Sequence, residues 1–413
     1  MMRIKEELGF LRGNLLVLIV TYMVFGLTSS MFTPFRSLYI RELGATPFII
    51  GLMDSIGNAI LAFIRIPGAF IADKYGRRKI IVIFTFGAAL SYAFYVFAWD
   101  WRIILLAMTI SSLSHIYQPA LEAIEADSLP TDKRGFGYTL IWLLPGIPAF
   151  FGPLISGYVV ERLGMVSGMR IVYASVLVLS LCIATIRWRF LRETIEIDKQ
   201  LGSKELVSSM RESFGSIVEA WRSVGWEVRL VTLVLLLMSF EYPLFATYYS
   251  LYAFDAVGVT GLEWGIITTV GSVVMLIAGL VSGRLIDVIG RRRSLIIGYL
   301  FSIPTLLMFT FIKGYYQMMA VNILFQVANV FLFPALNALR ADIIPQELRG
   351  RVMGLMGTIR SLAIVPAGLV FGFLYDLNWS FPYYGGLLIE LTTVFIIWRY
   401  IVEPKSSEVS ISS

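Results

Sequence analysis

Several acidic and polar side chains stand inside long apolar stretches of this chain, where an uncompensated charge is costly and its presence favours a functional role. One polar stripe recurs at helical spacing and consists of Ser111, His115, Gln118, Glu122 and Glu125. A second stripe consists of Asn322, Gln326, Asn329, Asn337 and Arg340. Such stripes must face protein or a water-filled cavity, so we predict contacts with a substrate or a coupling proton. Interhelical hydrogen bonding is the competing interpretation, and His115 is expected to be a structural or substrate contact rather than a proton relay.

Glu241 occupies the centre of another apolar run, LMSFEYPLF. It lies about 12 residues beyond the start of that run, which at 1.5 Å per residue is roughly 18 Å into a bilayer. A carboxylate at that depth suits a group that carries a proton or binds a cationic substrate, and Pro243 can loosen the helix beside it. The competing interpretation is a buried glutamate held by a hydroxyl group, without any role in ion coupling.

Further charges in apolar runs are Arg36, Asp54, Arg65, Arg360 and Glu390. Asp54 is a second candidate for proton coupling. Arg36 lies near the end of its run, where it either binds a substrate carboxylate or extends its guanidinium to the membrane interface. Glu390 is assigned to packing.

The composition indicates the elements that must position these residues. Hydrophobic residues make up 57% of the chain and charged residues 15%, whereas soluble domains carry about 25% charged residues. Apolar runs long enough to cross a bilayer recur along the sequence, since a spanning helix needs about 20 mostly apolar residues. The fold class is therefore an all-α membrane protein. The net charge of +6 follows from lysines and arginines in alternate loops rather than from nucleic-acid binding.

We predict twelve spans, at residues 14–40, 47–72, 79–98, 102–128, 136–162, 166–189, 229–254, 261–285, 293–312, 315–343, 351–375 and 379–402. The basic loops place both termini in the cytoplasm. The expected organisation is a six-helix half at 1–189, a cytoplasmic linker with an amphipathic helix at 190–228, a second six-helix half at 229–402 and a tail at 403–413.

An internal repeat supports two pseudo-symmetric halves. PALEAIEADSLPTDKRG (119–135) is echoed by PALNALRADIIPQELRG (334–350), and ADKYGRRK (72–79) by IDVIGRRR (286–293). Two six-helix units that meet along an axis normal to the membrane form a transporter architecture. The repeat also changes Glu122 to Asn337 and Glu125 to Arg340, so the residues expected in the cavity diverge while the flanking residues persist.

The motif after the second span resembles the signature of the major facilitator superfamily, Gly-x-x-x-Asp-Arg-x-Gly-Arg-Arg/Lys. The first copy matches at Asp73, Gly76, Arg77 and Arg78. The second copy matches at Gly283, Asp287, Gly290, Arg291 and Arg292. The resemblance covers the whole chain and implies the twelve-helix fold of that family, with spans one, four, seven and ten around a central cavity, and secondary transport by alternating access.

The same resemblance implies a cytoplasmic gate. Asp73 ends a helix, where the dipole disfavours its charge, and the positive start of span eleven lies on the same side of the membrane. By pseudosymmetry Asp287 would face the start of span five. We expect Arg77 to pair with Asp127 and Arg291 with Asp342. Pairing of Glu125 with Arg340 across the cavity is a further hypothesis.

Span five contains PGIPAFFGPLISG, which resembles the antiporter motif of this family at Gly152, Pro153 and Gly157. Small residues and proline permit a kink and close helix packing. The match favours export, although Ser156 replaces one glycine of the motif.

The sequence therefore favours a secondary active transporter, with proton-coupled efflux of amphipathic or organic solutes as the leading hypothesis. The alternatives are an uptake symporter for a sugar or organic anion, or a non-transporting sensor or lipid scramblase on the same fold. One Cys and one His argue against a metal site or a Cys/His catalytic pair, and the absence of a visible nucleophile–base pair argues against an enzyme. The sequence has no Walker loop, which argues against direct use of ATP. We expect a monomer in the cell membrane that meets a small-molecule substrate, H+ and lipid, without nucleic acid or cofactor.

Overall fold

A computed structural model describes residues 11–130, 133–195, 221–222, 224–345 and 348–403. Within these ranges 12 helical segments are long and apolar enough to cross a membrane. They begin and end within a few residues of the predicted spans, so the prediction of a twelve-span all-α fold is confirmed. The amphipathic helix expected in the linker and the tail beyond residue 403 lie outside the described residues.

The first six spans are helical, and spans one, four and five are interrupted. In chain order they are α2 (Asn14–Phe32) with η1 (Thr33–Phe35) and α3 (Arg36–Glu42), α4 (Pro47–Tyr75), α5 (Arg77–Phe97), α6 (Trp101–Ser114) with η2 (His115–Tyr117) and α7 (Gln118–Ser128), α8 (Arg134–Leu143) with α9 (Gly146–Ala149) and α10 (Phe151–Leu163), and α11 (Met165–Phe190). The break before α9 falls at Pro145, which cannot donate the hydrogen bond that a continuous helix requires.

The last six spans are also given in chain order. They are α13 (Trp226–Pro243) with η4 (Leu244–Tyr248), α14 (Tyr249–Tyr252) and η5 (Ala253–Val257), then α15 (Gly261–Ile289), α16 (Arg291–Phe309), α17 (Tyr315–Ile343), α18 (Arg349–Leu377) and α19 (Phe381–Tyr400). The elements η4 and η5 are π-helical turns. Turns of this kind are often found at functional sites in α-helices, and here they follow Glu241 and Pro243 in span seven.

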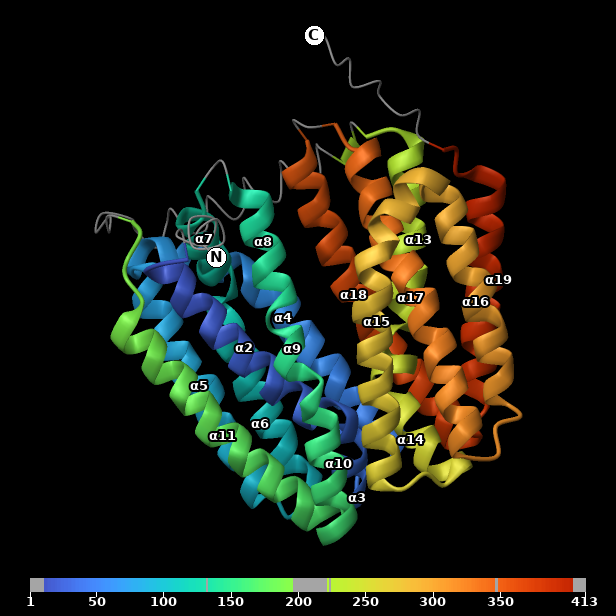
Figure 1. Ribbon diagram of the computed structural model, residues 1–413, viewed down its shortest axis with the longest axis horizontal. Helices are drawn as coiled ribbons and strands as arrows, with labels where there is room; N and C mark the ends of the chain where they lie inside the picture. The colour runs from blue at the N-terminus through green and yellow to red at the C-terminus, as the bar shows by residue number, and fades with distance from the viewer. Residues whose placement is uncertain (1–10, 131–132, 196–220, 223, 346–347, 404–413) are drawn as a thin grey trace, which may run out of the picture.

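The two sets of six spans lie side by side (Figure 1). We call the end of the bundle at Gly76 and Gly290 the motif side, and the end at Gly44 and Gly258 the far side. The sets come together at the far side, around α3, α10 and α14, and their helices spread apart toward the motif side.

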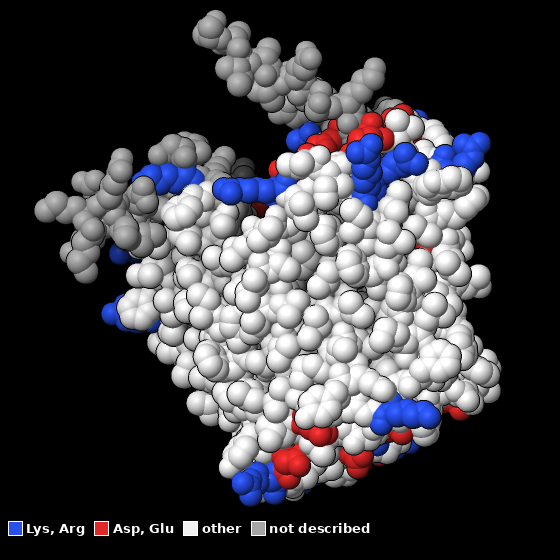
Figure 2. Space-filling model, turned by 45° about the vertical axis from the view of Figure 1, so that its right-hand side comes forward, with Lys and Arg blue, Asp and Glu red and all other residues white. Residues whose placement is uncertain are grey.

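The outer surface matches a lipid environment. In the face shown in Figure 2, a broad band with few charged residues, which lie near its left and right edges, separates the charged residues at the two ends of the molecule. Large apolar side chains on the surface include Trp142, Leu280 and Val288, which are 86%, 68% and 85% exposed. Such exposure would be unfavourable in water and is expected against acyl chains.

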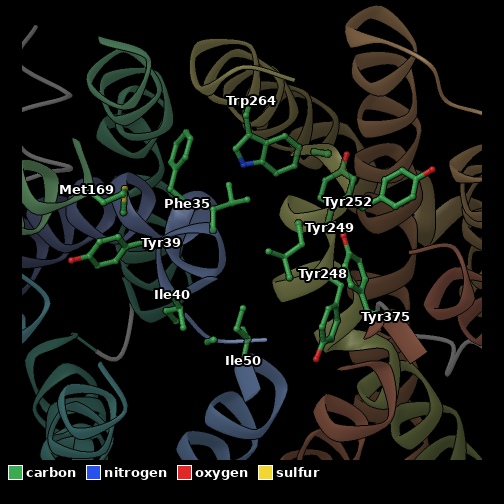
Figure 3. Packing of buried hydrophobic residues seen from close by; sticks show 14 of the residues in the cluster. Phe35, Tyr39, Ile40, Ile50, Met169, Tyr248, Tyr249, Tyr252, Trp264 and Tyr375 are labelled. Atoms are coloured by element: carbon green, nitrogen blue, oxygen red, sulfur yellow. The ribbon is translucent and has the colours of Figure 1, made fainter. Parts of the chain in front are cut away.

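The largest buried cluster joins both halves at the far side. It contains Tyr39 from α3 on one side and Tyr249, Tyr252 and Trp264 from α14 and α15 on the other (Figure 3). Trp264 Nε1 donates to the Pro34 carbonyl of the first half at 2.9 Å. Close helix contact completes the seam, because the positions where Gly51 and Gly368 would carry a Cβ are filled by the backbone of the other helix. The far side is therefore sealed by both aromatic packing and glycine contacts.

Candidate functional site

The signature arginines form matching ion-pair clusters on the motif side. In the first half Arg77 contacts Asp73 at 3.1 Å and Asp127 at 2.6 Å. In the second half Arg291 contacts Asp287 at 2.5 Å and Asp342 at 3.2 Å. These contacts are the ones expected from the sequence for Arg77 with Asp127 and for Arg291 with Asp342, and each arginine joins two helices of its own half.

A glycine makes each cluster possible. Gly76 has φ 93° and Gly290 has φ 98°, a backbone region that favours glycine, so one residue turns α4 into α5 and α15 into α16. The next backbone amides are capped by acidic residues: Arg78 N donates to Glu193 at 3.0 Å and Arg292 N donates to Glu403 at 2.9 Å. The repeat therefore preserves a three-helix junction in both halves.

Among the residues that the structure describes, the contact expected between Asp73 and the start of span eleven is not present in this conformation. Asp73 pairs within its own half. The span-eleven glycines Gly354 and Gly357 have open space where a Cβ would stand, as does Gly283. The reason is the separation of the two halves on the motif side (Figure 1).

Arg36 and Asp54 belong to one network near the far side. Arg36 Nη2 lies 2.8 Å from Asp54 Oδ1, and Thr247 Oγ1 in the other half donates to Asp54 Oδ2 at 2.5 Å. The expectation that Arg36 extends to the membrane interface is therefore wrong, because its guanidinium finds a carboxylate in the protein instead. The network lines a cavity of about 200 Å³ together with Asn58 and Ser112.

The span-four stripe makes short-range contacts. His115 Nδ1 lies 2.7 Å from the Ser111 carbonyl, and Gln118 donates to Glu122 at 3.5 Å. Glu125 accepts a hydrogen bond of 3.1 Å from Tyr22 on α2. The stripe is thus engaged in local and interhelical bonds, the interpretation that competed with a substrate role.

Glu125 and Arg340 do not pair across the cavity. Arg340 instead donates to Asn337 at 3.2 Å and contacts the Met353 sulfur at 3.7 Å, while Glu125 is bound by Tyr22. The two helices belong to halves that spread apart on this side, so each charged group finds a partner within its own half.

The largest cavity that holds polar residues from the predictions has a volume of about 560 Å³, and nearly all of its lining comes from the second half, with Thr33 from the first half. Five of the predicted residues line it: Glu241, Gln326, Asn329, Asn337 and Arg340. Aromatic walls are contributed by Phe245, Phe325 and Phe333. An apolar cavity with a few polar groups is the usual form of a small-molecule site.

Two buried glutamates from different helices line this cavity. Glu241 on α13 is 6% exposed and Glu390 on α19 is 1% exposed. Ser302 donates a hydrogen bond to Glu390 Oε1. Glu241 Oε1, Glu390 Oε2 and the Tyr299 hydroxyl are buried without a hydrogen-bond partner. The assignment of Glu390 to packing alone misses its place in the wall of the cavity.

Sequence reasoning also overlooked Arg187 on α11, which is 3% exposed. Its guanidinium donates to Thr85 at 3.2 Å and lies over the rings of Tyr22 and Tyr117. The available signal was an arginine one turn before the end of a spanning helix, a position that usually suits snorkelling. Only the arrangement of α2, α5 and η2 around it shows that it points inward.

The antiporter-like motif lies at contacts between helices. A Cβ on Gly152 would stand 2.7 Å from Met31 N on α2, and one on Gly157 would stand 2.7 Å from the Gly261 carbonyl on α15. Pro153 is buried between them. The expected close packing is present, and Gly157 places it at the seam between the two halves.

Twelve membrane-spanning helices around a partly polar internal cavity define a membrane transporter. The sequence profile of the Major Facilitator Superfamily matches residues 18–262 and 231–412, and the chain belongs to this family. It is a multi-pass membrane transporter and not an enzyme.

Relatives of similar length are drug-resistance proteins. The chain is 22% identical over 370 residues to the quinolone resistance protein NorA of Staphylococcus aureus, with 88% of this chain and 90% of NorA covered. It is 24% identical over 369 residues to the multi-drug resistance efflux pump PmrA homolog of Lactococcus lactis, with 87% of each covered.

Solved structures share the fold. The nucleoside transporter NupG aligns with a TM-score of 0.73 at 14% identity, covering 92% of this chain and 98% of NupG. A D-xylose–proton symporter aligns with a TM-score of 0.72 at 13% identity, covering 95% and 98%. These similarities establish the architecture.

Proposed function

We propose that this protein is a proton-coupled exporter of amphipathic organic solutes that works by alternating access, with Glu241 exchanging a proton for a cationic group of the substrate. Efflux relatives support the direction. The observation that carries the proposal is a buried, unpartnered carboxyl oxygen of Glu241 in an aromatic cavity of drug size. In such a cavity a carboxylate needs either a proton or a cation to offset its charge.

The proposal includes an orientation. The motif side faces the cytoplasm, as the positive-inside rule favours for its arginines, and the cell membrane holds the protein as a monomer. The conformation described above then corresponds to the state open to the cytoplasm. The two halves, residues 1–189 and 229–402, rock about the far-side seam, and the linker at 190–228 joins them.

The test is transport of ethidium, an aromatic cation, into liposomes that contain the purified protein with its motif side outward. An acidic lumen should drive ethidium inward as protons leave. Glu241→Gln should reduce the gradient-driven rate at least tenfold and leave ethidium exchange at equal pH measurable, because the amide retains the size of the side chain but binds no proton.

Glu227→Gln serves as the matched control, since Glu227 is exposed in the first turn of the same helix. Wild-type liposomes that accumulate ethidium equally with and without the gradient would refute proton coupling. A Glu241→Gln protein as responsive as the wild type would remove Glu241 from the mechanism and direct attention to Asp54 and Glu122.

A second candidate function is transport of an organic anion. It is favoured by Arg340 and Arg360, which line the same cavity, and by the buried Arg340 Nε, which has no hydrogen-bond partner. A guanidinium with a free donor can bind a carboxylate. The same liposomes loaded with an aromatic carboxylate, such as salicylate, distinguish this function from cation export.

A further inference from the structure

Resting on the proposed function, we propose that Glu241 and Glu390 form one proton-binding site, in which Glu390 on α19 is a functional partner and Ser302 and Tyr299 on α16 position the two carboxyl groups. The proposal adds a residue of span twelve, a span that the sequence analysis treated as supporting. It also changes the unit that takes up the proton from a single glutamate to a pair.

The first step of the argument is location. Glu241, Glu390, Tyr299 and Ser302 line the same cavity although they come from three helices. Both glutamates are more than nine-tenths buried, at 6% and 1% exposure. Two buried carboxylates in the wall of one cavity destabilise each other when both are ionised, because desolvation and mutual repulsion add.

The second step is the unused hydrogen-bonding capacity. One oxygen of each carboxyl group and the Tyr299 hydroxyl are buried without a partner. Buried polar groups are normally satisfied, so three unsatisfied atoms around one cavity leave hydrogen-bonding capacity that the protein itself does not use. A proton on either carboxyl group converts an acceptor into a donor and so supplies what the cluster lacks.

The third step is the role of the hydroxyl groups. Ser302 donates to Glu390 Oε1, which fixes that carboxyl group and directs its second oxygen into the cavity. Tyr299 is 1% exposed and lines the same cavity as both glutamates. Ser302 is bonded to one carboxyl group and the Tyr299 hydroxyl is buried in the same cavity wall, so we assign both residues a positioning role.

The charged and titratable groups that line the cavity around the pair come from four helices. They are Tyr242 on α13, Tyr299 on α16, Arg340 on α17 and Arg360 on α18. The two arginines can offset one negative charge but cannot accept a proton, since a guanidinium stays protonated in proteins. Proton exchange in this cavity therefore falls to the two glutamates: each gained proton comes from water in the cavity and returns to water when it is lost.

Infrared spectroscopy of the purified protein in lipid bilayers tests the proposal without any substrate. The C=O stretch of protonated carboxyl groups is followed through a pH titration. Because interacting sites lose their protons in separate macroscopic steps, the wild type should show two steps from the pair. Glu241→Gln and Glu390→Gln should each leave one step, and the double variant should leave neither. Glu227→Gln should match the wild type.

A Glu390→Gln titration that superimposes on the wild type would overturn the proposal. If the Glu390 variant does not fold, Ser302→Ala tests the paired site instead. In that variant both carboxyl signals should move, since the two groups act as one site; movement of the Glu390 signal alone would refute the coupling. The ethidium assay reports separately on the proposed function: intact two-step titration with no gradient-driven transport would reject export and leave the paired site standing.

Discussion

Arg41 at the end of α3 forms an ion pair with Asp255 in η5, so the first and second halves are joined by opposite charges at the far side. Tyr375 on α18 donates to the other oxygen of Asp255 at 2.9 Å. Arg41 and Asp255 are separated by 214 residues. The pair is about one-quarter exposed, with side-chain exposures of 24% and 23%, and it lies at the edge of the aromatic seam.

The first prediction concerns closure of the far side. Asp255→Asn removes the charge that holds Arg41, so the far-side-closed state should lose on the order of 1 kcal/mol, which corresponds to about a fivefold change in population. Labelling of a cysteine at buried Ser37, in a Cys182→Ser background, should accelerate by that factor. Asp100→Asn is the control, because Asp100 pairs with neighbouring Arg102 at 3.1 Å within one half. Equal labelling in both variants would show that the ion pair does not hold the seam.

The second prediction concerns the glycine contact between α4 and α18. Gly51→Ala places a methyl group onto the Gly368 carbonyl and the Tyr248 hydroxyl, so the far-side-closed state should be destabilised by about 2 kcal/mol. The same cysteine-labelling assay should show far-side opening. Gly279→Ala is the matched control within a helix, since nothing lies within 4 Å of the added Cβ, and it should leave labelling unchanged.

The spans and the junctions around the signature motif are predictable from the sequence because their causes are local. Apolar length defines the helices, and a glycine with a following arginine defines the turn at Gly76 and at Gly290. The ion pair between Arg77 and Asp127 follows from the same motif, since both residues end on one side of the membrane.

The contacts of Glu390 and Arg36 are not predictable in this way. Each depends on which face of one helix meets another helix, and an apolar span has little periodicity to define its inward face. Glu390 and Glu241 line one cavity although they are 149 positions apart in the sequence, and the residues between them do not indicate that arrangement. The missing contact between Asp73 and span eleven has a different cause: it depends on the conformation, which a sequence does not specify.

The third prediction concerns the motif-side gate. Asp73→Asn removes one of two carboxylates that bind Arg77, and in the closed state it would also remove the charge expected at the start of α18. The Asp73 side chain is 56% exposed in its ion pair with Arg77, so the free energy of unfolding should change by less than about 0.5 kcal/mol. Cysteine labelling from the motif side should nevertheless rise.

The pseudo-symmetric variant Asp287→Asn provides the comparison, because Asp287 binds Arg291 in the same way. Labelling of Asp73→Asn at the wild-type rate would remove the gating role. Equal increases in both variants would indicate that each half contributes one aspartate to closure.

The last prediction ranks three glutamates by their location. The sequence analysis placed Glu122 and Glu125 in a stripe facing the cavity and assigned Glu390 to packing, which would make Glu390 the least important of the three for transport. The structure motivates the opposite order, because Glu390 lines the same cavity as Glu241, whereas Glu122 is exposed and Glu125 is bound by Tyr22. Glu390→Gln should lower gradient-driven ethidium transport at least tenfold, and Glu122→Gln less than threefold, a difference of about 0.7 kcal/mol or more in the barrier. Glu125→Gln should fall between them, since an amide oxygen still accepts the Tyr22 hydrogen bond. Rates measured side by side at matched protein density decide the order, and a larger loss in Glu122→Gln than in Glu390→Gln would restore span four as the principal site.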